Sequence, residues 1–221
     1  MRDRRHPHLI TVIDRHFIED RLLIVMECAD QNLEEKLKEC QKNGLKGISR
    51  DNLLEYMKET AKALDYLADS PGGLKPIVHR DIKPQNILLM GGSVKVTDFG
   101  LATILKQTEV SHSGQLTARY AAPEFFDGKA FAQSDQYSLA VTYCFLRGGE
   151  LPFKGETLAE LLKSHVYEIP DLYMVPSTER TVLQRALSKI PKERWNSCRE
   201  FIEKLGEASD NQESQNWHLS R

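Results

Sequence analysis

Residues 79–86 read His-Arg-Asp-Ile-Lys-Pro-Gln-Asn, and residues 98–100 read Asp-Phe-Gly. Together they set out, in order, the polar groups that transfer of a phosphoryl group requires. The transition state of that reaction leaves a protein little covalent chemistry, so the site must position the reactants and neutralise charge. One carboxylate orients the attacking hydroxyl, and a second carboxylate with an amide holds Mg²⁺ against the phosphates. The stretch therefore predicts a phosphoryl-transfer site on this loop.

The polar side chains of the stretch each have a candidate role. Asp81 is the candidate base, and Lys83, close to it in sequence, can offset charge on the moving phosphoryl group. Asn86 and Asp98 offer the amide and carboxylate oxygens that Mg²⁺ prefers. The alternative interpretation is an ordinary polar surface loop. Several specified positions in order, with Asp-Phe-Gly after them, argue against that alternative.

The stretch matches the protein-kinase signature, H-R-D-L-x-x-x-N followed by D-F-G, except that Ile82 replaces leucine. The chain therefore resembles the eukaryotic-type protein kinases. The resemblance implies an α+β fold, namely a mostly helical large lobe preceded by the last two strands of the small lobe. It also implies catalytic roles for Asp81, Lys83 and Asn86, with ATP and Mg²⁺ as cofactors and a protein as substrate.

Residues 26–29 resemble the hinge of these kinases, whose backbone hydrogen-bonds to adenine. The nucleotide-binding residues that the resemblance implies are Glu27, Ala29, Lys83, Asn86 and Asp98. Among these residues, Asn86 and Asp98 are the implied ligands of the metal.

Residues 117–124, T-A-R-Y-A-A-P-E, resemble the element that closes the activation segment of a kinase. The resemblance implies that Glu124 pairs with Arg194 inside the large lobe, and that Asp135 anchors the backbone of the catalytic loop. Lys83 with Thr117 resembles the pair found in members that act on serine and threonine.

Arg80 precedes the candidate base, and the resemblance implies that a phosphate on the activation loop pairs with it. Ser113 is the first candidate for that phosphate, and Ser111 and Thr108 are alternatives.

Two features with which the family binds ATP are missing from the sequence. No G-x-G-x-x-G motif occurs, and no lysine precedes Lys36. Residues 6–10 resemble the turn after the glutamate-bearing helix of the small lobe, so the chain is expected to begin just after that helix. The expected domains are a small-lobe remnant (1–27), the hinge and large lobe (28–206), and a polar, disordered tail (207–221).

The resemblance favours an N-terminally truncated protein serine/threonine kinase, which transfers the γ-phosphate of ATP to hydroxyl groups of proteins. The alternative function is that of a catalytically impaired kinase fragment or pseudokinase, acting as a binding or regulatory module. In both cases the incomplete small-lobe sheet exposes an unpaired strand edge, and we expect self-association through it.

The composition limits the class of protein further. The chain has 221 residues, 40% hydrophobic and 28% charged, which indicates one globular domain. A net charge of −2 gives no reason to expect nucleic acid as a partner, and no apolar run is long enough for a membrane segment. The four cysteines are far apart in sequence, which favours free thiols and a cytoplasmic location.

The hydrophobic pattern predicts the elements that carry these motifs. Strands are expected over residues 9–17 and 22–26, and a short hairpin over residues 87–96. Asp30 is expected to cap a helix that carries Leu33 and Leu37. The helices expected downstream run over residues 50–69, 135–146, 157–165, 177–188 and 198–206.

Overall fold

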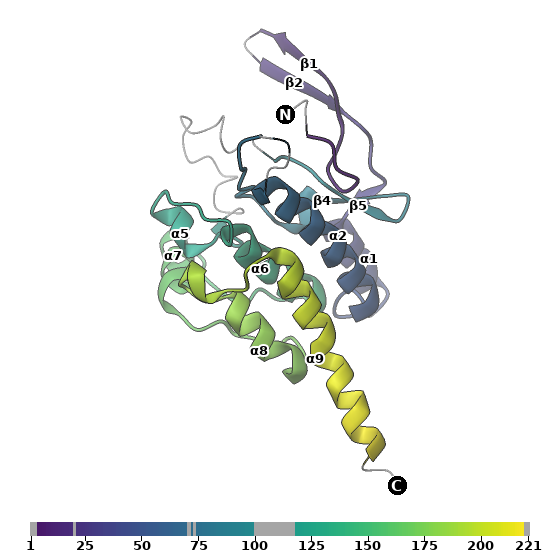
Figure 1. The fold of residues 1–221 in the computed structure, drawn as a ribbon, viewed down its shortest axis with the longest axis vertical. Helices are drawn as coiled ribbons and strands as arrows, with labels where there is room; N and C mark the ends of the chain where they lie inside the picture. The colour runs from purple at the N-terminus through teal and green to yellow at the C-terminus, as the bar shows by residue number, and fades with distance from the viewer. Residues whose placement is uncertain (1–3, 20, 70–71, 73, 100–117, 219–221) are drawn as a thin grey trace.

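The computed structural model describes residues 4–19, 21–69, 72, 74–99 and 118–218, and the side chains among them up to residue 208. Figure 1 shows a helical body with a two-stranded hairpin projecting from one end and the last helix leaving from the other. The α+β architecture expected from the sequence is confirmed, because helices dominate and the strands form two small sheets in the described part of the chain.

The projecting hairpin consists of β1 (Val12–Ile18) and β2 (Arg21–Met26), paired antiparallel. Both predicted strands form, but the first begins later than the pattern indicated. Leu9 makes an isolated parallel bridge to Val96, and the Ile10 N–H donates to the Val96 carbonyl at 2.9 Å. Leu9 is only 2% exposed, so this apolar segment joins the core instead of the projecting hairpin.

A second sheet, with the strand order β3-β4-β5, lies on the helical body. Its strands are β3 (Gln31–Asn32), β4 (Ile87–Met90) and β5 (Ser93–Val96). Gly91 and Gly92 connect β4 with β5 at φ of 57° and 84°, the left-handed region that glycine adopts without steric cost. The predicted short hairpin is therefore confirmed. Since β4 begins after Asn86 and β5 ends before Asp98, the hairpin brings both predicted metal ligands to one end of the sheet.

The first helix, α1 (Leu33–Lys42), is capped by Asn32, so the prediction of Asp30 as its cap was wrong. The Asn32 side chain accepts a hydrogen bond from the Glu35 N–H at 3.0 Å, and the Glu35 carboxylate accepts one from the Asn32 N–H at 2.9 Å. This reciprocal capping box explains why Asn32 takes the position. The Asp30 carboxylate accepts the Gly91 N–H at 2.8 Å and so ties the β4–β5 turn to the start of the helix.

Two long helices, α2 (Arg50–Asp69) and α6 (Ser134–Gly148), form the centre of the helical body. The buried face of α2 is mostly apolar, and it includes Leu53, Leu54, Met57, Ala61 and Leu64. Nearly every position of α6 is buried, and Gly149 ends it in the left-handed conformation with φ of 81°. The central position of α6 lets its polar side chains reach several functional segments.

The C-terminal half adds α5 (Pro123–Phe126), α7 (Leu158–Tyr167), α8 (Ser177–Ala186), the short 3₁₀ helix η3 (Pro191–Glu193) and α9 (Cys198–His218). The predicted end of the last helix at Gly206 was wrong, and residues 207–218, expected in a disordered tail, are helical. No proline or glycine follows Gly206 in the sequence, so nothing local stops the helix. No helix among the described residues is both long and apolar enough to cross a membrane.

Candidate active site

Asp135 on α6 anchors the loop of residues 79–86. Its carboxylate accepts the N–H of His79 at 2.7 Å and the N–H of Arg80 at 2.9 Å. Arg80 has a left-handed backbone with φ of 67°, a strained conformation that these two hydrogen bonds help to hold. Burial raises the pKa of Asp135, and the bonds from the two N–H groups offset part of that rise. The predicted anchoring by Asp135 is confirmed.

His79 connects this loop to the segment that precedes Asp98. Its Nε2 lies 2.8 Å from the Thr97 carbonyl oxygen, and its Nδ1 lies 3.3 Å from the N–H of Asp81. A carbonyl can only accept and an N–H can only donate, so Nε2 carries the proton and Nδ1 accepts. The imidazole is fully buried and serves as scaffold for the loop.

The structure brings the three predicted catalytic side chains into contact. One carboxylate oxygen of Asp81, Oδ2, accepts hydrogen bonds from Lys83 Nζ at 2.8 Å and from Asn86 Nδ2 at 2.9 Å. Asn86 Nδ2 also donates to the backbone carbonyl of Asp81 at 2.7 Å. The other carboxylate oxygen, Oδ1, is buried and has no hydrogen-bond partner in the described part of the chain. The carboxylate is therefore fixed through one oxygen, while the other oxygen is left as an acceptor.

The predicted metal ligands, Asn86 and Asp98, are linked through the ends of the β4–β5 hairpin. The Thr97 N–H donates to the Asn86 carbonyl at 3.0 Å, and Asp98 follows with a left-handed φ of 63°. Among the described residues, the amide oxygen of Asn86 and the carboxylate of Asp98 accept no hydrogen bond, so both groups can offer oxygen to a cation. No group of three or more acidic, histidine or cysteine side chains gathers in that part of the chain. The donor set fits Mg²⁺, which commonly binds one or two protein oxygens, water and substrate phosphates.

The predicted hinge residues, Glu27 and Ala29, follow β2 at the base of the projecting hairpin. The N–H of Glu27 donates to the Thr11 carbonyl at 3.1 Å, and the N–H of Thr11 donates to the Glu27 carboxylate at 2.7 Å. Lys95 Nζ lies 3.3 Å from the same carboxylate. The Glu27 side chain therefore fastens the base of the hairpin.

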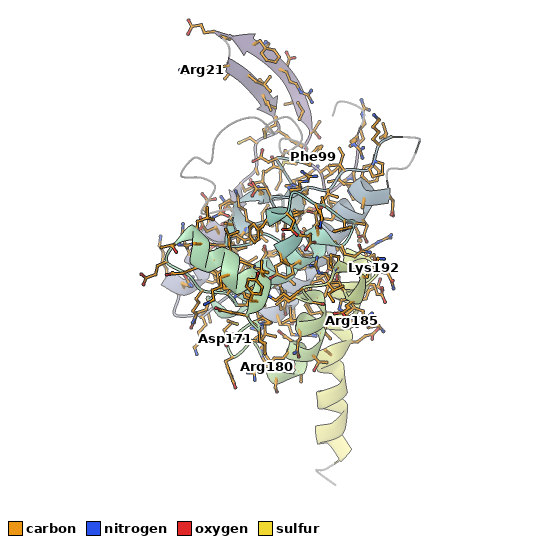
Figure 2. The ribbon with its side chains drawn as sticks, turned by 90° about the vertical axis from the view of Figure 1, so that its left-hand side faces the viewer. Arg21, Phe99, Asp171, Arg180, Arg185 and Lys192 are labelled. Carbon is orange, nitrogen blue, oxygen red and sulfur yellow. The ribbon has the colours of Figure 1, made fainter. Side chains whose placement is uncertain are left out.

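Two cavities meet at Phe99, which Figure 2 shows below the hairpin whose tip carries Arg21. The cavity shared by the hairpin and Asp98 has a volume of about 20 Å³, room for little more than one water molecule. An open cavity of about 470 Å³, lined partly by Arg4 and Arg5, lies against another side of Phe99. The cavity of about 20 Å³ by itself is thus too small for a nucleotide.

The predicted pair of Glu124 and Arg194 is confirmed. The two guanidinium nitrogens donate to the two carboxylate oxygens at 2.7 Å and 2.8 Å, and both side chains are buried. Burial works to raise the pKa of Glu124, but hydrogen bonds and charge from Arg194, with the hydroxyl of Ser134, hold that pKa below its ordinary value. The pair fixes the end of the T-A-R-Y-A-A-P-E element against the C-terminal helices.

Several predictions fall on residues outside the described part of the chain. They concern Gly100, the substrate-class residue Thr117, and the candidate phosphorylation sites Ser113, Ser111 and Thr108.

Sequence reasoning missed two contacts beside the candidate site. Gln85, in the catalytic loop, donates to the Glu34 carboxylate on α1 at 2.9 Å. His165, on α7, lies 3.2 Å from the carbonyl oxygen of Arg119. An acidic residue on an amphipathic helix and a lone histidine among apolar residues carry no sequence signal of such contacts.

Comparison with known proteins agrees with this geometry. The family model described as the protein kinase domain matches residues 1–213. The chain is similar to the probable serine/threonine-protein kinase PknB of Lactococcus lactis, with 31% identity over 212 residues, covering 91% of this chain and 32% of that protein.

Two further relatives have names of the same kind. The serine/threonine-protein kinase PrkC of Bacillus subtilis is 30% identical over 215 residues, covering 93% of this chain and 32% of that protein. The serine/threonine-protein kinase PknF of Mycobacterium tuberculosis is 30% identical over 215 residues, covering 91% of this chain and 44% of that protein. The chain spans less than half the length of these curated relatives.

Proposed function

The chain belongs to the protein kinase domain family, of the serine/threonine type, and from that premise we propose that it transfers the γ-phosphate of ATP to serine or threonine hydroxyls of proteins. The proposal assigns the reaction to the loop of residues 79–86 together with Asp98. Its cofactors are ATP and Mg²⁺, and its substrate is a protein side chain that bears a hydroxyl group.

The hydrogen bonding of the Asp81 carboxylate is the observation that supports this function best. Its Oδ2 is held by Lys83 and Asn86, while its Oδ1 is buried with no donor in the described part of the chain. A buried acceptor without a donor raises the free energy of the folded state by about 1–3 kcal/mol. Such an atom calls for an explanation, and a substrate hydroxyl supplies the missing donor.

Each residue of the site then has a defined task. Asp81 orients the attacking hydroxyl and holds its proton at Oδ1, and Lys83 keeps the carboxylate in place and adds positive charge beside it. Glu27 and Ala29 contribute backbone groups to the adenine. Asn86 and Asp98 offer the oxygens that hold Mg²⁺, which neutralises charge on the phosphates when it is bound.

A second copy of this chain is the further partner that we propose. The hairpin of β1 and β2 forms a sheet of its own in the described part of the chain, so the outer edge of each strand is unpaired. Large apolar side chains are exposed along both strands. Pairing of two hairpins satisfies the open edges and covers these side chains.

A binding or regulatory module without efficient catalysis is the second candidate function. The cavity of about 20 Å³ between the hairpin and Asp98 favours it, since a nucleotide needs much more room there.

The experiment that tests the kinase function compares the wild-type chain with Asp81→Asn in transfer from radiolabelled ATP to serine and threonine peptides. We expect kcat to fall by about 10²- to 10⁴-fold, because the base acts in the transition state, while the KM for ATP stays unchanged. Asp127→Asn is the matched control, since this aspartate is exposed and pairs only loosely with Lys129, at 3.8 Å.

The outcomes separate the two candidate functions. Wild-type transfer that survives in Asp81→Asn removes Asp81 from the site. A wild-type chain that binds a fluorescent ATP analogue without transferring phosphate, in the presence of Mg²⁺, supports the module. A chain that neither binds nor transfers contradicts the kinase proposal.

A further inference from the structure

The segment that follows Thr117 lies beside the catalytic loop. Tyr120 is buried, and its ring meets that of Phe145 edge to face with the ring centroids 6.3 Å apart. Burial raises the pKa of Tyr120, and the nearby carboxylate of Glu34 raises it further. The same carboxylate accepts the hydrogen bond from Gln85 in the loop, at 2.9 Å. Residues 118–122 therefore run next to the residues that surround Asp81.

A single histidine holds the backbone at the start of this segment. His165 is fully buried on α7, which lies beside α5 and the chain that leads into it (Figure 1). Its Nε2 lies 3.2 Å from the Arg119 carbonyl oxygen, and its Nδ1 lies 2.9 Å from the Tyr137 hydroxyl. Since the carbonyl can only accept, Nε2 is the donor and Nδ1 accepts from the hydroxyl. Both nitrogens of the ring are thus engaged.

The surroundings of His165 keep its ring neutral and fixed. Phe153 packs against it with the ring centroids 4.6 Å apart, and Lys189 Nζ donates to the His165 backbone carbonyl at 2.7 Å. Burial, together with the positive charge of Lys189, lowers the pKa of His165 to about 4. At neutral pH the ring therefore keeps one proton and one orientation.

Tyr137 joins this contact to the catalytic loop. It lies on α6, the helix whose Asp135 holds the N–H groups of His79 and Arg80. One rigid helix therefore fixes the catalytic loop through Asp135, and fixes Arg119 through Tyr137 and His165. A histidine that only filled the core would not need to reach a backbone carbonyl of a different segment.

We propose that His165 is a positioning residue for the protein substrate, because its hydrogen bond to the Arg119 carbonyl sets the backbone of residues 118–122, which run beside the loop that carries Asp81. The inference rests on the proposed kinase function. It assigns His165 to binding of the peptide and not to binding of ATP. His165 contacts the carbonyl of Arg119, so its effect on the substrate acts through the backbone of that residue.

The test measures the KM for a peptide and the KM for ATP separately in His165→Phe, which keeps an aromatic ring and removes both hydrogen bonds. We expect the KM for the peptide to rise about tenfold, the loss expected for one buried hydrogen bond, with the KM for ATP unchanged. His165→Gln retains an N–H donor at the end of its side chain, and we expect it to restore most of the peptide affinity. Ser164→Ala is the matched control, because the buried Ser164 hydroxyl donates to the Leu161 carbonyl of its own helix, its one hydrogen bond among the described residues.

Hydrogen exchange at the backbone amides of residues 120–122 gives a readout that does not depend on activity. We expect faster exchange there in His165→Phe than in Ser164→Ala, with circular dichroism spectra unchanged. Equal exchange, or a KM for ATP that rises together with the KM for the peptide, overturns the proposal. A wild-type chain that transfers no phosphate contradicts the proposed function, while the exchange result still decides whether His165 positions the segment.

Discussion

The guanidinium of Arg194 is the most heavily bonded side chain around the candidate site. It donates to both carboxylate oxygens of Glu124, to the Gln133 carbonyl at 3.0 Å and to the Ser188 carbonyl at 2.9 Å. A charge buried this deeply is stable only while its partners remain, since removal of one partner leaves the other without compensation. Removal of one partner therefore lowers the free energy of unfolding by more than the intact pair adds to it.

We predict that Glu124→Ala and Arg194→Ala each lower the free energy of unfolding by about 3–5 kcal/mol, and that the double variant loses clearly less than the sum. Urea unfolding of the four proteins measures this coupling. The exposed pair of Asp127 and Lys129, 3.8 Å apart, is the control cycle, and we expect almost no coupling there. Additive losses at Glu124 and Arg194 contradict the pairing.

The same pair has a defined pH dependence. The pKa of Glu124 is held below its ordinary value, so the folded protein binds the proton on this carboxylate less readily than the unfolded chain. The stability from the pair is therefore complete above the ordinary carboxyl pKa of about 4.3, and it is lost as the pH falls through the lower folded pKa. The difference in unfolding free energy between wild type and Glu124→Gln should shrink over that acidic range.

At the level of residues, the sequence predicts those side chains whose chemical role only a few residue types can fill. Asp81, Lys83 and Asn86 were predicted together because phosphoryl transfer needs those groups at that spacing, and the structure does bring them into contact. His165 was not predictable, because its hydrogen bond to Arg119 depends on two segments that only the tertiary fold places together. A lone histidine within an apolar helix is most often an ordinary core residue.

Helices and strands were most predictable from the sequence where turn residues set their ends. Gly91 and Gly92 adopt positive φ between β4 and β5, and that turn, visible in the sequence, sets the spacing of Asn86 and Asp98. The end of α9 was not predictable in the same way. Its continuation past Gly206 shows that a single glycine does not stop a helix when no capping residue follows.

One buried carboxylate strengthens the contact between α2 and α9. Asp65 on α2 is buried and accepts the N–H groups of Cys198 at 2.9 Å and Arg199 at 3.1 Å, at the N-terminus of α9. Arg199 Nε also donates to it at 2.9 Å. The side chain thus caps a helix other than its own, where both the free N–H groups and the helix dipole favour a negative charge.

We predict that Asp65→Asn lowers the free energy of unfolding by about 1–3 kcal/mol, because an amide replaces an acceptor oxygen by a donor opposite an N–H group. Urea unfolding followed by circular dichroism measures the loss. Glu55→Gln, on the exposed side of the same helix, is the control, since its pairing with Lys58 should add less than about 1 kcal/mol. Equal losses of unfolding free energy in Asp65→Asn and Glu55→Gln would show that Asp65 does not strengthen the contact between α2 and α9.

Across the whole molecule, large apolar side chains are mostly buried in the helical body, whereas several of them are exposed on the hairpin. Phe17 on β1 is 80% exposed and Leu23 on β2 is 48% exposed. The sequence of β2 after Arg21 is a continuous apolar run, a pattern typical of a strand covered on both faces, yet β2 is an edge strand in the described part of the chain. The sequence predicted both strands and their open edge, but not that the hairpin would project away from the body (Figure 1).

This contrast leads to the prediction that the protein self-associates through β2. Antiparallel pairing of two β2 strands about Ile24 would place Leu23 of each copy opposite Val25 of the other and would satisfy the open backbone groups. Light scattering coupled to size-exclusion chromatography should therefore give a mass above 25.3 kDa that falls towards this monomer value on dilution.

Leu23→Lys should shift this equilibrium to the monomer, because a charge on an edge strand must lose its hydration when another strand pairs over it. Leu45→Lys is the matched control, since Leu45 is 55% exposed but lies on the helical body, outside the hairpin. If self-association ran through scattered apolar side chains, both variants would weaken it alike. If the wild-type chain stayed at the monomer mass at every concentration, the open edge of β2 would be tolerated, and pairing of hairpins would be excluded as the contact between copies.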